Sequence, residues 1–76
     1  SFSVYPNPAS DVLYLDSPAD LNSIRLFDLS GKMLKEIRVE GTQKHTIDLS
    51  GLHKGMYILK IETVRGDTKA LKVLKN

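Results

Sequence analysis

The chain has 76 residues, of which 41% are hydrophobic and 26% are charged, and its formal net charge is +2. This length allows one small core and no second domain, and the composition is typical of a folded globular chain. No apolar run approaches about eighteen residues, which excludes a membrane-spanning helix. The absence of cysteine excludes disulfides, thiolate metal sites and cysteine nucleophiles.

Turn-forming clusters divide the chain into segments of the length and pattern of β-strands, and no long helical periodicity is present. The predicted strands are residues 2–5, 12–16, 23–28, 33–39, 45–49, 55–63 and 69–75. Regularly spaced short strands of this kind are typical of a β-sandwich or barrel. The sequence therefore predicts an all-β fold with seven strands.

Period-two alternation predicts which side chains face the core, because a slip of one residue would expose the whole apolar set. The side chains predicted to face inward are Leu13, Leu15, Ile24, Leu26, Ile47, Leu49, Tyr57, Leu59 and Ile61. The last strand has two alternatives. Either Leu71 and Val73 or Ala70 and Leu74 face the core.

Two motifs predict tight connections. Pro6, Asn7 and Pro8 predict a stiff corner between the first two strands, in which the Asn7 side chain bonds nearby backbone and Asp11 accepts from nearby amides. The segment from Asp28 to Lys32 predicts a hairpin with Gly31 at positive φ, since a phosphate-binding loop would need more glycines and a following helix.

The segment before the sixth predicted strand carries the pattern Leu-x-x-Gly-x-Tyr, formed by Leu52, Gly55 and Tyr57. This pattern is typical of the tyrosine corner of Greek-key sandwiches, where the phenol bonds backbone a few residues upstream. Leu52 is predicted to close the end of the sandwich, and Gly55 to let the chain turn. The motif favours a seven-stranded immunoglobulin-like Greek-key β-sandwich.

The residue patterns of catalysis, metal binding and cofactor binding are missing. His45 and His53 do not have metal-ligand spacing, and no nucleophile motif or calcium loop is present. Residues 32–76 carry ten basic and five acidic residues, but no aromatic residue lies among the C-terminal lysines, which argues against nucleic-acid binding. We therefore expect neither an enzyme nor a cofactor.

The chain ends on a strand with lysines at positions 69, 72 and 75. These lysines either protect an edge strand against stray pairing or form a basic edge that a partner recognises by strand addition. Such an edge can also pair with a second copy of the chain. Sequence physics alone does not separate these alternatives.

Five motifs follow one another along the chain. They are Tyr-Pro-Asn-Pro-x-x-Asp-x-Leu at 5–13, Phe-Asp-Leu-Ser-Gly-Lys at 27–32, Ile-Asp-Leu-Ser-Gly-Leu at 47–52, Gly-Met-Tyr at 55–57 and Lys-Val-Leu-Lys at 72–75. Their order resembles the C-terminal sorting domain of cargo proteins of the type IX (Por) secretion system of Bacteroidetes-group bacteria. The resemblance covers the whole chain.

The resemblance implies a non-catalytic secretion signal at the end of a larger cargo protein, with residues 1–76 as one domain. It implies passage through the periplasm, then the outer-membrane translocon, then release or cell-surface attachment after cleavage by a sortase-like protease. The implied partners are the translocon and outer-membrane shuttle and sortase proteins. The residues implied in recognition are Lys72, Val73, Leu74 and Lys75.

The alternative function is a passive spacer or a carbohydrate-binding module attached to a secreted enzyme. Glycan binding normally needs exposed aromatic side chains on one face, and only Tyr14 and Phe27 are candidates.

Overall fold

The computed structural model describes all residues from 1 to 76. It has five strands, which are β1 (Ser3–Tyr5), β2 (Val12–Asp28), β3 (Met33–Asp48), β4 (Gly55–Thr63) and β5 (Thr68–Lys75). All pairings between them are antiparallel and join them into one sheet in the order β1-β2-β4-β5, with β3 on the other side of β2. No helix is long and apolar enough to span a membrane.

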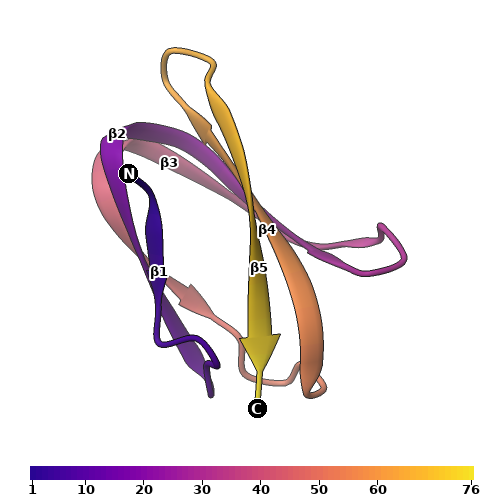
Figure 1. The fold of residues 1–76 in the computed structure, drawn as a ribbon. Helices are drawn as coiled ribbons and strands as arrows, with labels where there is room; N and C mark the ends of the chain where they lie inside the picture. The colour runs from indigo at the N-terminus through magenta and orange to yellow at the C-terminus, as the bar shows by residue number, and fades with distance from the viewer.

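The sheet curls into two layers because β2 and β3 arch together from one layer into the other (Figure 1). One layer contains β1, residues 12–16 of β2 and residues 44–48 of β3. The other contains the beginning of β3, residues 21–28 of β2, then β4 and β5. The core lies between these layers.

The prediction of seven strands is wrong, although the all-β class is confirmed. The predicted turns near residues 17–20 and 40–42 are bends inside β2 and β3, and Leu21 still pairs with Thr42 within the bend. Within the bend the Ser17 hydroxyl bonds both backbone groups of Ala19. It accepts from the Ala19 N–H at 3.1 Å and donates to the Ala19 carbonyl. The strands continue because the bend is absorbed by shifts of register rather than by a loop.

All nine side chains predicted to face inward are buried, together with Ala9, Leu21, Val39 and Val73. In β5 the structure decides between the two alternatives: Leu71 packs against the core and Val73 is fully buried, while Ala70 and Leu74 face outward. The burial of Ala9 has no periodic signal in the sequence, because it lies in a connection between strands.

Candidate functional site

β5 lies at one edge of its layer, with β4 as its only neighbour strand (Figure 1). Its alternation separates the four residues implied in recognition into two pairs. Val73 and Lys75 face inward and are buried, whereas Lys72 is exposed and Leu74 is 37% exposed. The folded domain therefore presents only Lys72 and Leu74 of these four side chains to a partner.

Lys75 closes the end of the sandwich with its side-chain ammonium. Nζ donates to the Leu52 carbonyl oxygen at 2.8 Å and lies 3.7 Å from Asp11 Oδ1. Leu52 itself packs against the core at the same end. A buried lysine needs such partners, because an unpaired buried charge is costly.

The corner of Pro6, Asn7 and Pro8 is bound to β5. Asn7 Nδ2 donates to the Lys72 carbonyl at 3.1 Å, and Asn7 Oδ1 accepts from the Leu74 N–H at 3.0 Å. The predicted bond from Asn7 to nearby backbone is therefore wrong, since both partners lie more than sixty residues away. The corner connects β1 to β2, as predicted, but it also holds the last strand.

Ala9 extends this contact by one more residue pair. Its N–H donates to the Leu74 carbonyl and its carbonyl accepts from the Asn76 N–H, both at 2.8 Å, forming a parallel bridge to Lys75. We call residues 7–9 the clamp. Asp11 lies just beyond the clamp. Its carboxylate lies near the Lys75 ammonium rather than accepting from nearby amides, so that prediction for Asp11 is also wrong.

The tyrosine-corner interpretation predicts a bond that the structure contains. Tyr57 Oη donates to the His53 carbonyl, four residues upstream, at 2.5 Å, and the Tyr57 side chain is buried. Gly55 has φ of 149°, a conformation that side-chain-bearing residues rarely adopt. The connection between β3 and β4 is thereby fixed against the end of the core that Lys75 closes.

The hairpin between β2 and β3 forms as predicted, with Gly31 at φ 92°. Asp28 Oδ1 accepts from the Ser30 hydroxyl at 2.6 Å and from the N–H groups of Ser30 and Lys32 at 2.9 and 3.0 Å. These bonds, led by the one from the Ser30 hydroxyl, lower the pKa of Asp28 because they favour its charged form.

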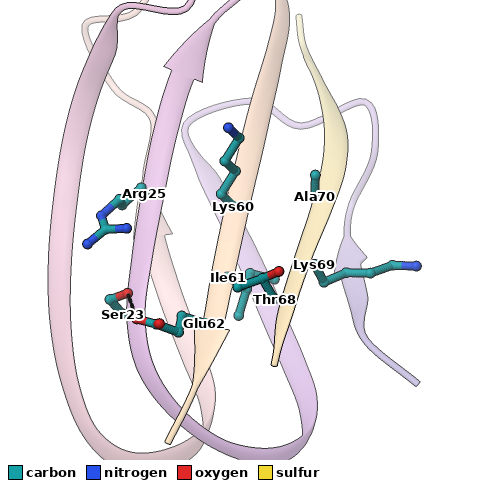
Figure 2. Close-up of a pocket in the computed structure, with 8 residues that line it drawn as sticks. All are labelled: Ser23, Arg25, Lys60, Ile61, Glu62, Thr68, Lys69 and Ala70. Carbon is teal, nitrogen blue, oxygen red and sulfur yellow. Dashed lines mark hydrogen bonds between the residues drawn. The ribbon is translucent and has the colours of Figure 1, made fainter. Parts of the chain in front are cut away.

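A groove of about 370 Å³ lies on the outer face of the layer that contains β5, as Figure 2 shows. A row of paired residues crosses this face from Arg25 on β2 through Lys60 on β4 to Ala70 on β5. Arg25 is neutralised by Glu36, whose Oε2 accepts from Nε at 2.8 Å, and this bond lowers the pKa of Glu36. Glu62 in the same groove accepts hydrogen bonds from Asn22 and Ser23.

The candidate glycan-binding aromatics do not share a face. Tyr14 lies beside Tyr5 in the layer of β1, with ring centroids 5.7 Å apart, and pairs across to β3. Phe27 lies in the other layer, with the Lys60 ammonium 4.9 Å from its ring centre. Tyr14 and Phe27 therefore form no common aromatic surface, and the ring exposed beside Tyr14 is that of Tyr5. No group of three or more acidic, histidine or cysteine side chains is placed to hold a metal ion.

The fold defines the chain as an immunoglobulin-like β-sandwich domain. It superposes with TM-score 0.80 on a DUF3244 family protein of that fold from Bacteroides vulgatus, at 20% identity, covering 99% of this chain and 84% of that one. It also superposes with TM-score 0.78 on part of PorZ, a surface component of the type-IX secretion system of Porphyromonas gingivalis, at 17% identity over 100% of this chain and 11% of that one. At these identities the likeness concerns the fold alone.

A sequence model of the family described as "Secretion system C-terminal sorting domain" matches residues 3–76, so the chain belongs to that family. Beta-agarase D of Zobellia galactanivorans is 42% identical over 72 residues. That match includes 93% of this chain and 14% of the agarase, so the chain spans a small part of its relative's length. The domain is thus a C-terminal sorting signal of type IX secretion, as the motif order predicts.

Proposed function

We propose that residues 1–76 form one domain of a larger cargo protein and that its export machinery reads the outer face of β5. The observation that carries this proposal is that the side chains of the terminal motif, residues 72–75, alternate between the two faces of β5. Lys72 and Leu74 face solvent, while Val73 and Lys75 are buried inside the domain. Val73 and Lys75 then act by holding β5 in place.

The proposed route follows from membership of the sorting family. The cargo crosses the periplasm, the domain engages the type IX translocon and its shuttle and sortase proteins, and the cargo reaches the surface or the medium. The domain itself performs no catalysis, in agreement with its family and its immunoglobulin-like fold. Removal by a sortase-like protease belongs to the same proposal.

The test is export of a reporter that carries a signal peptide and residues 1–76, in a host with a type IX system. We expect the double variant Lys72→Glu, Leu74→Gln to remain in the periplasm, because it changes the outward pair without touching the core. Lys44→Glu, an exposed lysine of the other layer, is the matched control and should be exported. Surface export of the double variant at the level of the unmodified fusion would contradict recognition through β5.

A further inference from the structure

The clamp covers only part of the β5 edge. Its bonds reach the backbone of Lys72, Leu74 and Asn76, which are alternate residues. In an antiparallel strand alternate residues direct their N–H and C=O groups to the same side. Thr68 and Ala70 therefore also direct their backbone groups away from β4, as does the N–H of Lys72, and none of them contacts the clamp.

The open part of the edge, residues 68–72, is long enough for a partner strand. Five residues extend about 17 Å, close to the usual length of a strand in a sheet. No proline or bulge interrupts this part of β5, and its pairing with β4 is regular throughout. Lys69 and Lys72 are therefore the edge-protecting features of the open part, and a partner strand there has to complement their charge.

The groove beside the open edge carries more positive than negative charge, because Arg25, Lys60 and Lys69 line it together with a single carboxylate, Glu62. On the outer face Lys60 pairs with Ala70 across the ladder and Lys72 lies two residues further along β5. Neither forms an ion pair, and the Lys60 ammonium lies 4.9 Å from the centre of the Phe27 ring. The methyl group of Ala70 leaves the groove between Lys60 and the edge unfilled (Figure 2). Of the two carboxylates nearby, Glu36 forms an ion pair with Arg25, whereas Glu62 in the groove is hydrogen-bonded only to the neutral side chains of Asn22 and Ser23 and keeps its charge.

We propose that residues 68–72 of β5 bind an extended acidic segment of a partner protein as an added strand. The partner's backbone pairs with Ala70 and Lys72. A glutamate or aspartate opposite Ala70 enters the groove and meets Lys60 and Lys72. This inference rests on the proposed function, since it names the contact that the export machinery makes with β5. It places the backbone contact at residues 68–72, so that of residues 72–75 only Lys72 takes part in it.

The decisive variant is Ala70→Pro, with Ala70→Ser as its matched control. Proline removes the N–H that points outward and leaves the ladder to β4 intact, because Ala70 directs no backbone group toward β4. Serine keeps the N–H. Both variants should melt within a few degrees of the unmodified domain, which shows that any loss of binding is not a loss of fold.

The probe is a fluorescent heptapeptide, Thr-Val-Glu-Val-Glu-Val-Thr, with a second peptide in which lysine replaces both glutamates. We expect the acidic peptide to bind, to slow amide exchange at Ala70 and Lys72, and to lose binding to Ala70→Pro but not to Ala70→Ser. The lysine peptide, and the acidic peptide against Lys60→Glu, should bind more weakly by up to about fivefold for each charge pair lost, the range expected for cross-strand charge pairs. Absence of binding to the unmodified domain, or equal binding to Ala70→Pro, would overturn the inference.

The same variants in the export assay separate this inference from the proposed function. If the unmodified fusion is exported and folded Ala70→Pro is exported equally well, the strand-addition site is wrong while the sorting function stands. If the Lys72→Glu, Leu74→Gln fusion is exported normally, the proposed recognition of the outer face of β5 is wrong, whether or not the acidic peptide binds. Retention of Ala70→Pro in the periplasm beside export of Ala70→Ser supports the added strand.

Discussion

At the scale of single residues, the domain depends on side chains that bond backbone groups which no strand can satisfy. The Tyr57 hydroxyl donates to the His53 carbonyl, and the Lys75 ammonium donates to the Leu52 carbonyl. The Asn7 amide donates to the Lys72 carbonyl and accepts from the Leu74 N–H. Buried or edge backbone groups without a partner cost free energy, so each of these side chains stabilises a connection rather than the core itself.

Replacing Tyr57 by phenylalanine keeps the buried ring and removes one hydrogen bond. We expect the free energy of unfolding to fall by about 1 kcal/mol or more, because the His53 carbonyl loses its partner. Urea denaturation measures the change. Tyr14→Phe is the control, since the Tyr14 hydroxyl is exposed and forms no hydrogen bond in the structure. Equal midpoints for the two variants would contradict the tyrosine corner.

The Asp28 turn should make stability depend on pH in the acid range. Because the folded state lowers the pKa of Asp28, its carboxylate stabilises the domain above the ordinary aspartate pKa of about 3.9 and ceases to do so as pH falls through the lower folded value. We expect Asp28→Asn to melt lower than the unmodified domain at pH 7, and the difference to shrink as the pH falls below the ordinary aspartate pKa of about 3.9. Melting curves across this range measure the effect.

Asp67→Asn provides the comparison for the Asp28 variant, because the Asp67 carboxylate accepts no hydrogen bond in the structure and lies at the exposed tip of the β4–β5 hairpin. It should change the melting temperature less than Asp28→Asn at pH 7. A constant difference between Asp28→Asn and the unmodified domain from pH 7 to pH 2 would show that the charge of Asp28 has no part in the turn.

At the scale of elements, β5 is held by two unlike neighbours. Along its whole length it pairs with β4, and along its last residues it is also held by the clamp. Since an edge strand with one neighbour opens more easily than a central one, the clamped end of β5 should be more protected than its open beginning. The clamp near the beginning of the chain therefore stabilises the end of the last strand.

Asn7→Ala tests this stabilisation. We expect a loss of about 1 kcal/mol of stability and faster amide exchange at Leu74, whose N–H loses its acceptor, with little change at Val73, which faces Tyr57 in the ladder. Exchange measured by NMR distinguishes the two amides. Asn22→Ala, which removes an amide bonded to Glu62, should leave Leu74 unchanged. Equal acceleration at Leu74 and Val73 would mean that the clamp does not act locally.

At the scale of the whole molecule, two layers share one core of 13 buried residues, and the last strand supplies part of it. Val73 is fully buried, and Lys75 and Ala9 close the end of the sandwich. A domain this small has little stability to lose. The terminal motif is therefore part of the fold as well as a candidate for recognition.

Deletion of residues 72–76 should abolish cooperative thermal unfolding, because it removes Val73 from the core and leaves the Leu52 carbonyl and Ala9 backbone without partners. The double variant Lys72→Glu, Leu74→Gln should melt within a few degrees of the unmodified domain. Circular dichroism measures both. A truncated domain with an unchanged melting curve would show that the last residues serve recognition alone.

The sequence predicted the faces of the strands well and their ends less well. Alternation identified the buried residues of β2 and β4, because side chains in a strand must point to opposite faces whatever the strand pairs with. It could not show that residues 17–20 bend rather than turn, since that depends on the pairing of β2 with β3. Nor could it find the clamp, because Asn7 and Leu74 lie 67 residues apart and no local pattern links them.

One repeated tetrapeptide separates what the sequence determines from what the tertiary structure determines. Asp-Leu-Ser-Gly occurs at 28–31 and again at 48–51, and in both copies the aspartate Oδ1 accepts from the serine N–H at 2.9 Å while the glycine has positive φ. The sequence by itself determined these turns, because their bonds join residues two to four positions apart. Yet Leu29 is 68% exposed and Leu49 is fully buried. Only the tertiary structure decided that difference: the N–H of Leu49 bonds the Asp11 carbonyl at the closed end of the sandwich, whereas Leu29 lies at the tip of a hairpin.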